Sequence, residues 1–243
     1  MAAFVLIHGG FHGAWCWDKV IPLLEAQGHS VMAFDLPGHG ADKTPLGEVT
    51  MEAYVERVCK ALDAQPEPVI LVGHSMGGGV VTQTAENRPG KIKVLVYLSG
   101  ILPKNGQTLR GLFNSEENVG SLIHGNLIFS EDRLSSTLRE DALRDIFYGD
   151  CSEEDVAQAK ALWVPQALAP FFTPLQTTEA NFGSVPKVYI ETLADQCHIP
   201  AFQRMMYTAQ PCKEILSLNT SHCPIFSAPE ELVGHLTAPS VLD

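Results

Sequence analysis

The sequence has 243 residues, 45% hydrophobic and 18% charged, which is typical of one globular core with or without an inserted segment. Its 28 acidic and 16 basic residues give a formal net charge of −12, and no run is rich in lysine or arginine. Such a surface repels phosphate groups, so we expect no nucleic acid partner. No apolar stretch approaches the roughly 18 residues that span a bilayer, so we expect no membrane partner.

The cysteines are scattered and form no C-x-x-C pair. They are Cys16, Cys59, Cys151, Cys197, Cys212 and Cys223. The N-terminal sequence MAAFVLIHGG lacks the basic region of a secretory signal, so we expect reduced thiols and a cytoplasmic location. No cysteine has a second ligand at metal-site spacing, and we therefore expect no metal and no cofactor.

Short apolar strands alternate with helices in the first hundred residues. Strands are predicted at 4–7, 30–34, 69–72 and 94–98 from their apolar runs. Helices are predicted at 18–27, from an N-cap at Thr50 to Ala64, and directly after Ser75. This alternation indicates a parallel sheet with helices on both faces.

The alternation stops between about residues 103 and 186. Helical patterns cover 132–147 and 152–162, and prolines at 165, 170 and 174 divide the rest. The sheet pattern then resumes, with strands at 187–191 and 214–218 and helices at 199–209 and 229–236. We therefore predict a core of residues 1–102 and 187–243, with a helical cap of residues 103–186 inserted after the fourth strand.

The stretch LVGHSMGGGVVT at 71–82 joins a buried strand to a helix. Its Gly73-His74-Ser75-Met76-Gly77 segment has the G-x-S-x-G pattern of a nucleophile elbow. In such a turn the strand and the helix nearly touch, so a Cβ at Gly73 or Gly77 would collide. Glycine-rich turns without catalytic function share this pattern, so its meaning depends on partners for Ser75.

Those partners follow other strands. Asp195 and His222 come after the strands at 187–191 and 214–218, and the turn after the first strand supplies the amides of residues 9–11. Ligands of open parallel sheets bind at the carboxyl ends of the strands, where these loops meet. A serine nucleophile needs a base, and the base needs an orienting carboxylate. The chain order Ser75, Asp195, His222 is the order that accompanies this elbow.

Three other polar residues near these loops allow competing interpretations. Glu191 is an alternative acid, but as a strand residue it is expected to point along the sheet face, so Asp195 is preferred. His8 and His74 flank the predicted site, and we interpret them as hydrogen-bonded supports rather than a second base.

Five segments carry a resemblance to a known family. They are FVLIHGGFHGAWCW at 4–17, DLPGHG at 35–40, ILVGHSMGG at 70–78, YIETLADQCHIP at 189–200 and SHCPIFSAPEEL at 221–232. The chain resembles the α/β-hydrolase superfamily, and within it the branch of plant methylesterases, hydroxynitrile lyases and related bacterial esterases. This resemblance implies an α/β-hydrolase fold with about six mostly parallel strands flanked by helices.

The resemblance also implies site roles. Ser75 would be the nucleophile, His222 the general base and then acid, and Asp195 its orienting partner. The backbone N–H groups of Gly10 and Met76 would form the oxyanion hole.

The sequence departs from the lyases of this branch at two positions. Lyases have a threonine after the first histidine and a lysine after the catalytic one, where this chain has Gly9 and Cys223. Without the lysine, no group would hold a leaving cyanide. We therefore predict a serine carboxylesterase that cleaves small, largely apolar esters through an acyl-enzyme on Ser75.

Cyanohydrin cleavage is the alternative reaction, and a non-turnover receptor for a small molecule on a hydrolase fold is the alternative class. The sequence predicts neither the physiological ester nor the oligomeric state.

Overall fold

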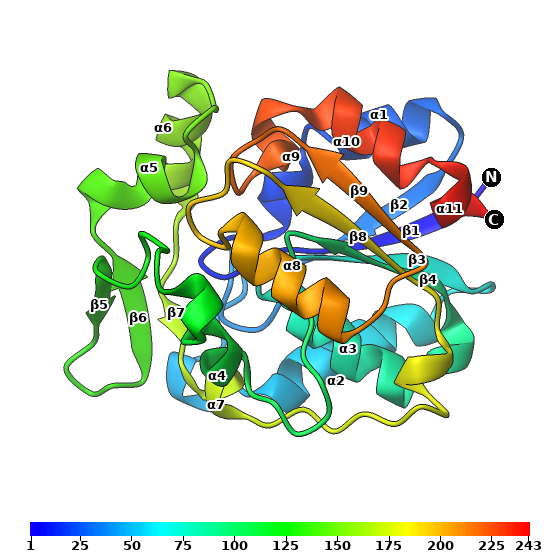
Figure 1. Cartoon of the computed structure of the whole chain (residues 1–243), viewed down its shortest axis with the longest axis horizontal. Coiled ribbons are helices and arrows are strands. Elements are labelled where there is room, and N and C mark those ends of the chain that lie inside the picture. Colours follow the sequence, from blue (N-terminus) through cyan, green and yellow to red (C-terminus); the bar gives the residue numbers. More distant parts are fainter.

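A computed structural model describes all 243 residues, which fold around a six-stranded sheet in the order β2-β1-β3-β4-β8-β9 (Figure 1). All neighbouring strands in this sheet are parallel. The strands are β1 (Ala3–Ile7), β2 (Ser30–Ala33), β3 (Val69–His74), β4 (Ile92–Leu98), β8 (Lys187–Thr192) and β9 (Glu214–Leu218). The prediction of about six mostly parallel strands is confirmed.

Helices cover both faces of the sheet. Figure 1 shows α1, α9, α10 and α11 on one side of the strands and α2, α3 and α8 on the other. Their bounds are α1 (Ile21–Ala26), α2 (Met51–Asp63), α3 (Gly77–Asn87), α8 (Pro200–Ala209), α9 (Pro224–Ser227), α10 (Pro229–Leu236) and α11 (Pro239–Leu242). The predicted alternation of strands and helices is therefore confirmed.

Local chemistry sets several helix boundaries. Thr50 caps α2 by accepting a hydrogen bond from the Ala53 N–H, as the sequence predicts. Helix α1 begins only at Ile21, three residues later than predicted from position 18. Pro22 lies in its first turn, where the missing N–H costs nothing, whereas a helix begun further upstream would place this proline in its interior.

The segment between β4 and β8 contains both helices and strands. Three short antiparallel strands, β5 (Leu127–Phe129), β6 (Ser135–Leu138) and β7 (Gln166–Ala167), form a second sheet. The helices are α4 (Leu109–Phe113), α5 (Leu143–Phe147), α6 (Glu153–Leu162) and α7 (Ala169–Phe172). In Figure 1 much of this segment, from β5 to β7, lies beyond the end of the central sheet that is opposite the chain termini.

One prediction for this segment is correct and one is wrong. Helix α6 lies within the predicted helix at 152–162, and it begins after an N-cap at Ser152, whose hydroxyl accepts from the Asp155 N–H. The predicted helix over 132–147 is wrong, because β6 occupies residues 135–138. Only a short 3-10 helix at Glu140–Ala142 and α5 after it are helical. The segment is therefore not purely helical. Residues 135–138 pair with β5 on one side and β7 on the other. These cross-strand contacts stabilise a strand more than the apolar spacing of the sequence stabilises a helix.

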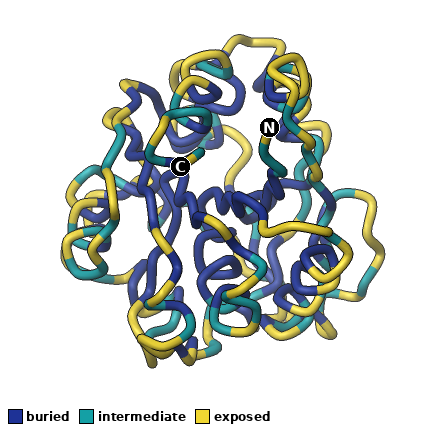
Figure 2. Tube along the Cα trace, turned by 90° about the vertical axis from the view of Figure 1, so that its right-hand side faces the viewer, coloured by how far each residue is buried: buried dark blue, intermediate teal, exposed yellow.

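A single apolar core of 65 buried residues runs through the molecule, and Figure 2 shows the buried trace concentrated at its centre. The core includes Ile146 and Tyr148 from the segment between β4 and β8, so this segment packs as part of the same body. None of the helices has the length and apolar character needed to cross a membrane.

The turn between β3 and α3 depends on two glycines. A Cβ on Gly73 would lie 2.7 Å from the carbonyl oxygen of Gly77, and one on Gly77 would lie 2.8 Å from that of His8. Both distances are shorter than real Cβ contacts, and backbone atoms cannot rotate away. The predicted absence of space at these positions is confirmed.

We expect Gly73→Ala to destabilise the fold by about 1–3 kcal/mol, because the added methyl group overpacks two backbone segments. The matched control is Gly234→Ala in α10, where no atom lies within 4 Å of the added Cβ. This change should stabilise the helix by about 0.5–1 kcal/mol. Thermal unfolding of the two variants measures both effects, and equal stability of Gly73→Ala and wild type would contradict the steric account.

Candidate active site

Each predicted site residue lies just beyond the carboxyl end of a strand in the central sheet. Gly10 follows β1, Ser75 follows β3, Asp195 follows β8 and His222 follows β9. Parallel strands end at a common edge, so the fold carries these four loops to one region. The sequence predicts that these loops meet at the carboxyl ends of the strands, and the structure has this arrangement.

Ser75 has a strained backbone. Its φ of 54° lies in the left-handed region, which residues other than glycine rarely adopt. Hydrogen bonds on both sides hold this conformation: the Ser75 N–H donates to the Leu98 carbonyl at 3.2 Å, and the Ser75 carbonyl accepts from the Ile101 N–H at 2.9 Å. Strain of this kind persists only where the surroundings enforce it, and it is typical of functional sites.

His222 and Asp195 form a fully buried pair. His222 Nδ1 lies 2.7 Å from Asp195 Oδ2. The Asp195 carboxylate also accepts from the Thr192 hydroxyl at 2.8 Å and from the N–H groups of Cys197 at 2.7 Å and His198 at 2.8 Å. These donors fix the carboxylate and support its negative charge, so the carboxylate can orient the imidazole.

Glu191 takes no part in this pair. Its two carboxylate oxygens accept hydrogen bonds from Ser217 Oγ at 2.8 Å and Tyr207 Oη at 3.1 Å. The acid in contact with His222 is Asp195, as the sequence reasoning preferred.

His222 Nε2 is buried and has no hydrogen-bond partner. Burial lowers the pKa of His222 to about 3 and raises that of Asp195 to about 6. At neutral pH the imidazole is therefore uncharged, and Nε2 is free to accept a proton. No hydrogen bond joins Ser75 to His222 in this structure, and such contacts are commonly loose before substrate binds.

The neighbouring histidines make hydrogen bonds to the backbone. His74 Nε2 lies 3.0 Å from the His222 carbonyl oxygen, and His8 Nε2 accepts from the Leu36 N–H at 3.1 Å. Burial lowers the pKa of both rings well below the usual value, so they are neutral. These contacts are those of supporting residues, as predicted.

Cys197, His198 and His222 have possible metal-binding atoms within 4.8 Å of one another. His198 Nδ1 already lies 2.7 Å from the Ser99 carbonyl oxygen. Burial raises the pKa of the Cys197 thiol well above its usual value and so disfavours the thiolate that a metal requires. The donor set therefore suits a metal ion poorly.

The N–H groups of Gly10 and Met76 donate to no carbonyl or side chain of the protein. Gly10 lies in the turn after β1, and Met76 precedes the first residue of α3. Both residues line the same cavity as Ser75. Two unpaired N–H groups beside a serine can bind the negative oxygen that develops during attack on a carbonyl.

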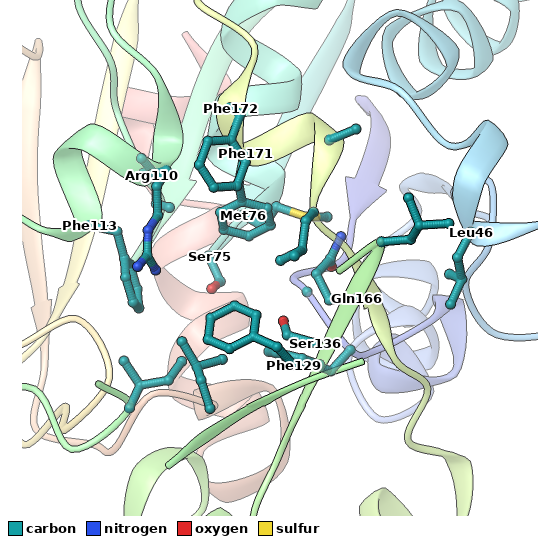
Figure 3. A pocket seen from close by; sticks show the side chains of 18 of the residues that line it. Leu46, Ser75, Met76, Arg110, Phe113, Phe129, Ser136, Gln166, Phe171 and Phe172 are labelled. Atoms are coloured by element: carbon teal, nitrogen blue, oxygen red, sulfur yellow. The ribbon is translucent and has the colours of Figure 1, made fainter. Parts of the chain in front are cut away.

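The cavity has a volume of about 650 Å³. Of its 23 lining residues, 15 are hydrophobic, and 15 of the 23 come from the segment between β4 and β8. Figure 3 shows phenylalanine rings around Ser75, among them Phe113, Phe129, Phe171 and Phe172. Aromatic residues of the insertion therefore form much of the wall.

Several supporting residues were not predicted. Gln166 Oε1 accepts a hydrogen bond from His39 Nε2 at 3.0 Å, and Gln166 Nε2 donates to Tyr54 Oη at 3.1 Å. A Cβ on Gly10 would lie 2.9 Å from Gln166 Oε1. Asp150 accepts hydrogen bonds from the Ser221 hydroxyl and N–H beside His222. The sequence gives no distinct signal for Gln166 or Asp150, because polar and charged residues occur throughout the insertion.

The position of Gly9 bears on the lyase alternative. A Cβ at this position would lie 2.9 Å from Ser75 Cβ and 3.1 Å from His74 Nδ1. A threonine here would require Ser75 or His74 to move. The backbone in this structure is thus fitted to glycine at the position where the lyases have threonine.

A parallel sheet that presents a strained serine, a buried histidine–carboxylate pair and free N–H groups is the arrangement of serine hydrolases. A model of the alpha/beta hydrolase family matches residues 4–235. The chain therefore belongs to the alpha/beta hydrolase family.

Individual relatives are similar over most of the chain. A pyrethroid hydrolase of Sphingobium wenxiniae is 35% identical over 235 residues, which cover 94% of this chain and 84% of the relative. A crystal structure of a pyrethroid hydrolase from Sphingobium faniae has a TM-score of 0.88 and 33% identity, covering 97% of this chain and 95% of that one.

Plant relatives differ in length. Methylesterase 9 of Arabidopsis thaliana is 32% identical over 256 residues, with 97% of each chain covered. Three chloroplastic proteins of the same plant, named methylesterases 11, 15 and 13, are 32% to 34% identical, and this chain spans only 54% to 61% of their length.

We expect Asp195→Asn to slow the reaction of Ser75 with a fluorophosphonate probe by about 10³–10⁴-fold, because the imidazole loses its orienting charge. Glu191→Gln is the matched control, since this buried acid does not contact His222, and it should label within about threefold of wild type. Intact-protein mass spectrometry measures the labelling rate. Equal slowing in both variants would contradict the assignment.

Proposed function

We propose that the chain is a serine carboxylesterase in which Ser75 is the nucleophile, His222 the general base and Asp195 its orienting partner. One observation carries the proposal: His222 pairs through Nδ1 with a buried carboxylate and leaves its buried Nε2 unpaired, and its loop follows β9 at the same sheet edge at which Ser75 follows β3. The names of the relatives, methylesterase and pyrethroid hydrolase, support ester hydrolysis as the reaction.

The reaction would proceed in two stages. His222 Nε2 takes the proton of the Ser75 hydroxyl while Oγ attacks the ester carbonyl carbon. The tetrahedral intermediate collapses, the C–O bond to the alcohol breaks, and the alcohol leaves with the proton from His222. Water then attacks the acyl-enzyme as His222 takes its proton, and collapse releases the acid and returns a proton to Ser75.

The Gly10 and Met76 N–H groups would bind the oxyanion in both stages. They are fixed by the turn after β1 and the start of α3, so little reorganisation is needed as charge develops. Loss of one such donor typically costs about 10²–10³ in rate.

Two positions disfavour cyanohydrin cleavage. Gly9 has no space for the side chain that lyases carry there. Cys223 is fully buried, and its thiol carries no positive charge in either protonation state, so it offers no cation for a leaving cyanide.

The substrate would be a small, largely apolar ester. We propose that residues 103–186 act as a cap on a core of residues 1–102 and 187–243 and set this preference, because most of the apolar cavity wall belongs to them. The six free thiols support a cytoplasmic location, since reduced cysteines persist in reducing compartments.

Wild type should hydrolyse a short p-nitrophenyl ester, and Ser75→Ala should lose at least about 10³-fold in kcat. Ser135→Ala is a matched control, because Ser135 is as buried as Ser75, at 7% exposure, but does not line the cavity. It should retain wild-type rates. Equal turnover by wild type and Ser75→Ala would overturn the proposal.

The pH dependence of kcat/KM should reflect the ionisation of the buried Asp195–His222 pair. Burial raises the pKa of Asp195 to about 6, so protonation below that pH removes the charge that stabilises the imidazolium. We expect kcat/KM to be constant above about pH 7 and to fall with a midpoint near 6 as the medium is acidified. A profile that stays flat well below pH 5 would contradict this assignment.

A further inference from the structure

The charge around the cavity is opposite in sign to the charge of the whole chain. No aspartate or glutamate lines the cavity, whereas Arg110 and Arg133 do. Among the other lining residues only Cys197 and His198 have titratable side chains. Burial raises the pKa of the Cys197 thiol and lowers the pKa of the His198 ring, so both are neutral at pH 7. In a protein with a formal net charge of −12, the cavity therefore carries net positive charge.

The two arginines differ in their surroundings. Arg133 is exposed, and its guanidinium lies 5.5 Å from the centre of the Phe129 ring, with Glu131 and Asp132 next to it in the sequence. Arg110 is half-buried on α4, between lining residues Phe113 and Phe172 in the view of Figure 3. Its side chain takes part in no ion pair and no hydrogen bond of the structure. Arg110 is thus an unpaired cation at an apolar cavity.

Figure 3 shows the nitrogen atoms of Arg110 directed along the Phe113 ring into the cavity that Ser75 also faces. A guanidinium in this position is hydrated while the cavity is empty. An apolar neutral substrate would displace that water and leave the charge unpaired, which is unfavourable. A substrate with its own anion would replace the water by a charge-assisted, bidentate contact.

We propose that Arg110 selects esters that carry a carboxylate in addition to the scissile ester bond. This inference rests on the proposed esterase function and narrows its substrate class. The apolar wall would bind the hydrocarbon part, and Arg110 would hold the remote carboxylate. A hydrogen bond to a charged group that is lost on substitution would weaken binding about 10–100-fold.

The test compares esters that differ only in the remote charge. Mono-p-nitrophenyl esters of succinate, glutarate and adipate place a carboxylate at increasing distance on the acyl side, and p-nitrophenyl butyrate, valerate and hexanoate are their neutral counterparts. Acetyl esters of hydroxycarboxylic acids and of the matching alcohols place the charge on the alcohol side. The two series show whether Arg110 binds a carboxylate on the acyl half or on the alcohol half of the substrate.

The variants are Arg110→Gln and Arg110→Lys. Arg57→Gln is the matched control: Arg57 is also half-buried, and its guanidinium lies 4.0 Å from the centre of the Phe34 ring, but it does not line the cavity. The Arg57→Gln substitution removes one positive charge, as Arg110→Gln does, without changing the cavity. Neutral esters also serve as the internal folding control for each variant.

We expect Arg110→Gln to lower kcat/KM by about 10–100-fold for the anionic esters of one series, mainly through KM. For the neutral counterparts kcat/KM should stay the same or rise, because the substitution removes the charge that an apolar ester leaves unpaired. Arg110→Lys should restore part of the loss, and Arg57→Gln should change neither. Equal effects of Arg110→Gln on charged and neutral esters in both series would overturn the inference. If wild type hydrolyses no ester in a Ser75-dependent way, the proposed function itself fails.

Discussion

The site depends on the close approach of strand β3 to helix α3. A Cβ on Gly73 would collide with the Gly77 carbonyl at the start of α3, and one on Gly77 would collide with the carbonyls of Ile7 and His8 at the end of β1. In the turn between the two glycines Ser75 has a φ of 54°. The serine therefore stands beyond the end of the sheet, and the N–H of Met76 is left unpaired beside it. The neighbouring loops only need to bring a base and a second donor to this fixed point.

Burial then determines the chemistry of the groups around that point. Removal from water keeps His222 uncharged at neutral pH, so that it can accept a proton, while four hydrogen bonds hold the Asp195 carboxylate in place behind it. The same enclosure makes an unpaired charge unfavourable within the cavity. This is why the environment of Arg110, which has no acidic partner, bears on which substrate the cavity accepts.

The sequence predicted the central sheet and the grouping of the site loops well, because these features are encoded locally. A short apolar run followed by a glycine turn or a polar loop locates Ser75, Asp195 and His222 without knowledge of distant contacts. The segment between β4 and β8 was predicted less well. Strand β6 depends on pairing with β5 and β7, and β7 lies about thirty residues away, so local spacing suggested a helix instead. The direction of the Arg110 side chain also depends on how α4 packs, which periodicity in a five-residue helix does not reveal.

The central claim is that Ser75 becomes covalently acylated, and acid quenching during turnover of p-nitrophenyl acetate tests it most directly. Proteolysis and mass spectrometry of the quenched protein should locate one acetyl group on the peptide that contains Ser75, and prolonged incubation without substrate should remove it. Turnover without any acylated peptide, or an acetyl group that accumulates on another residue at the rate of turnover, would contradict the account.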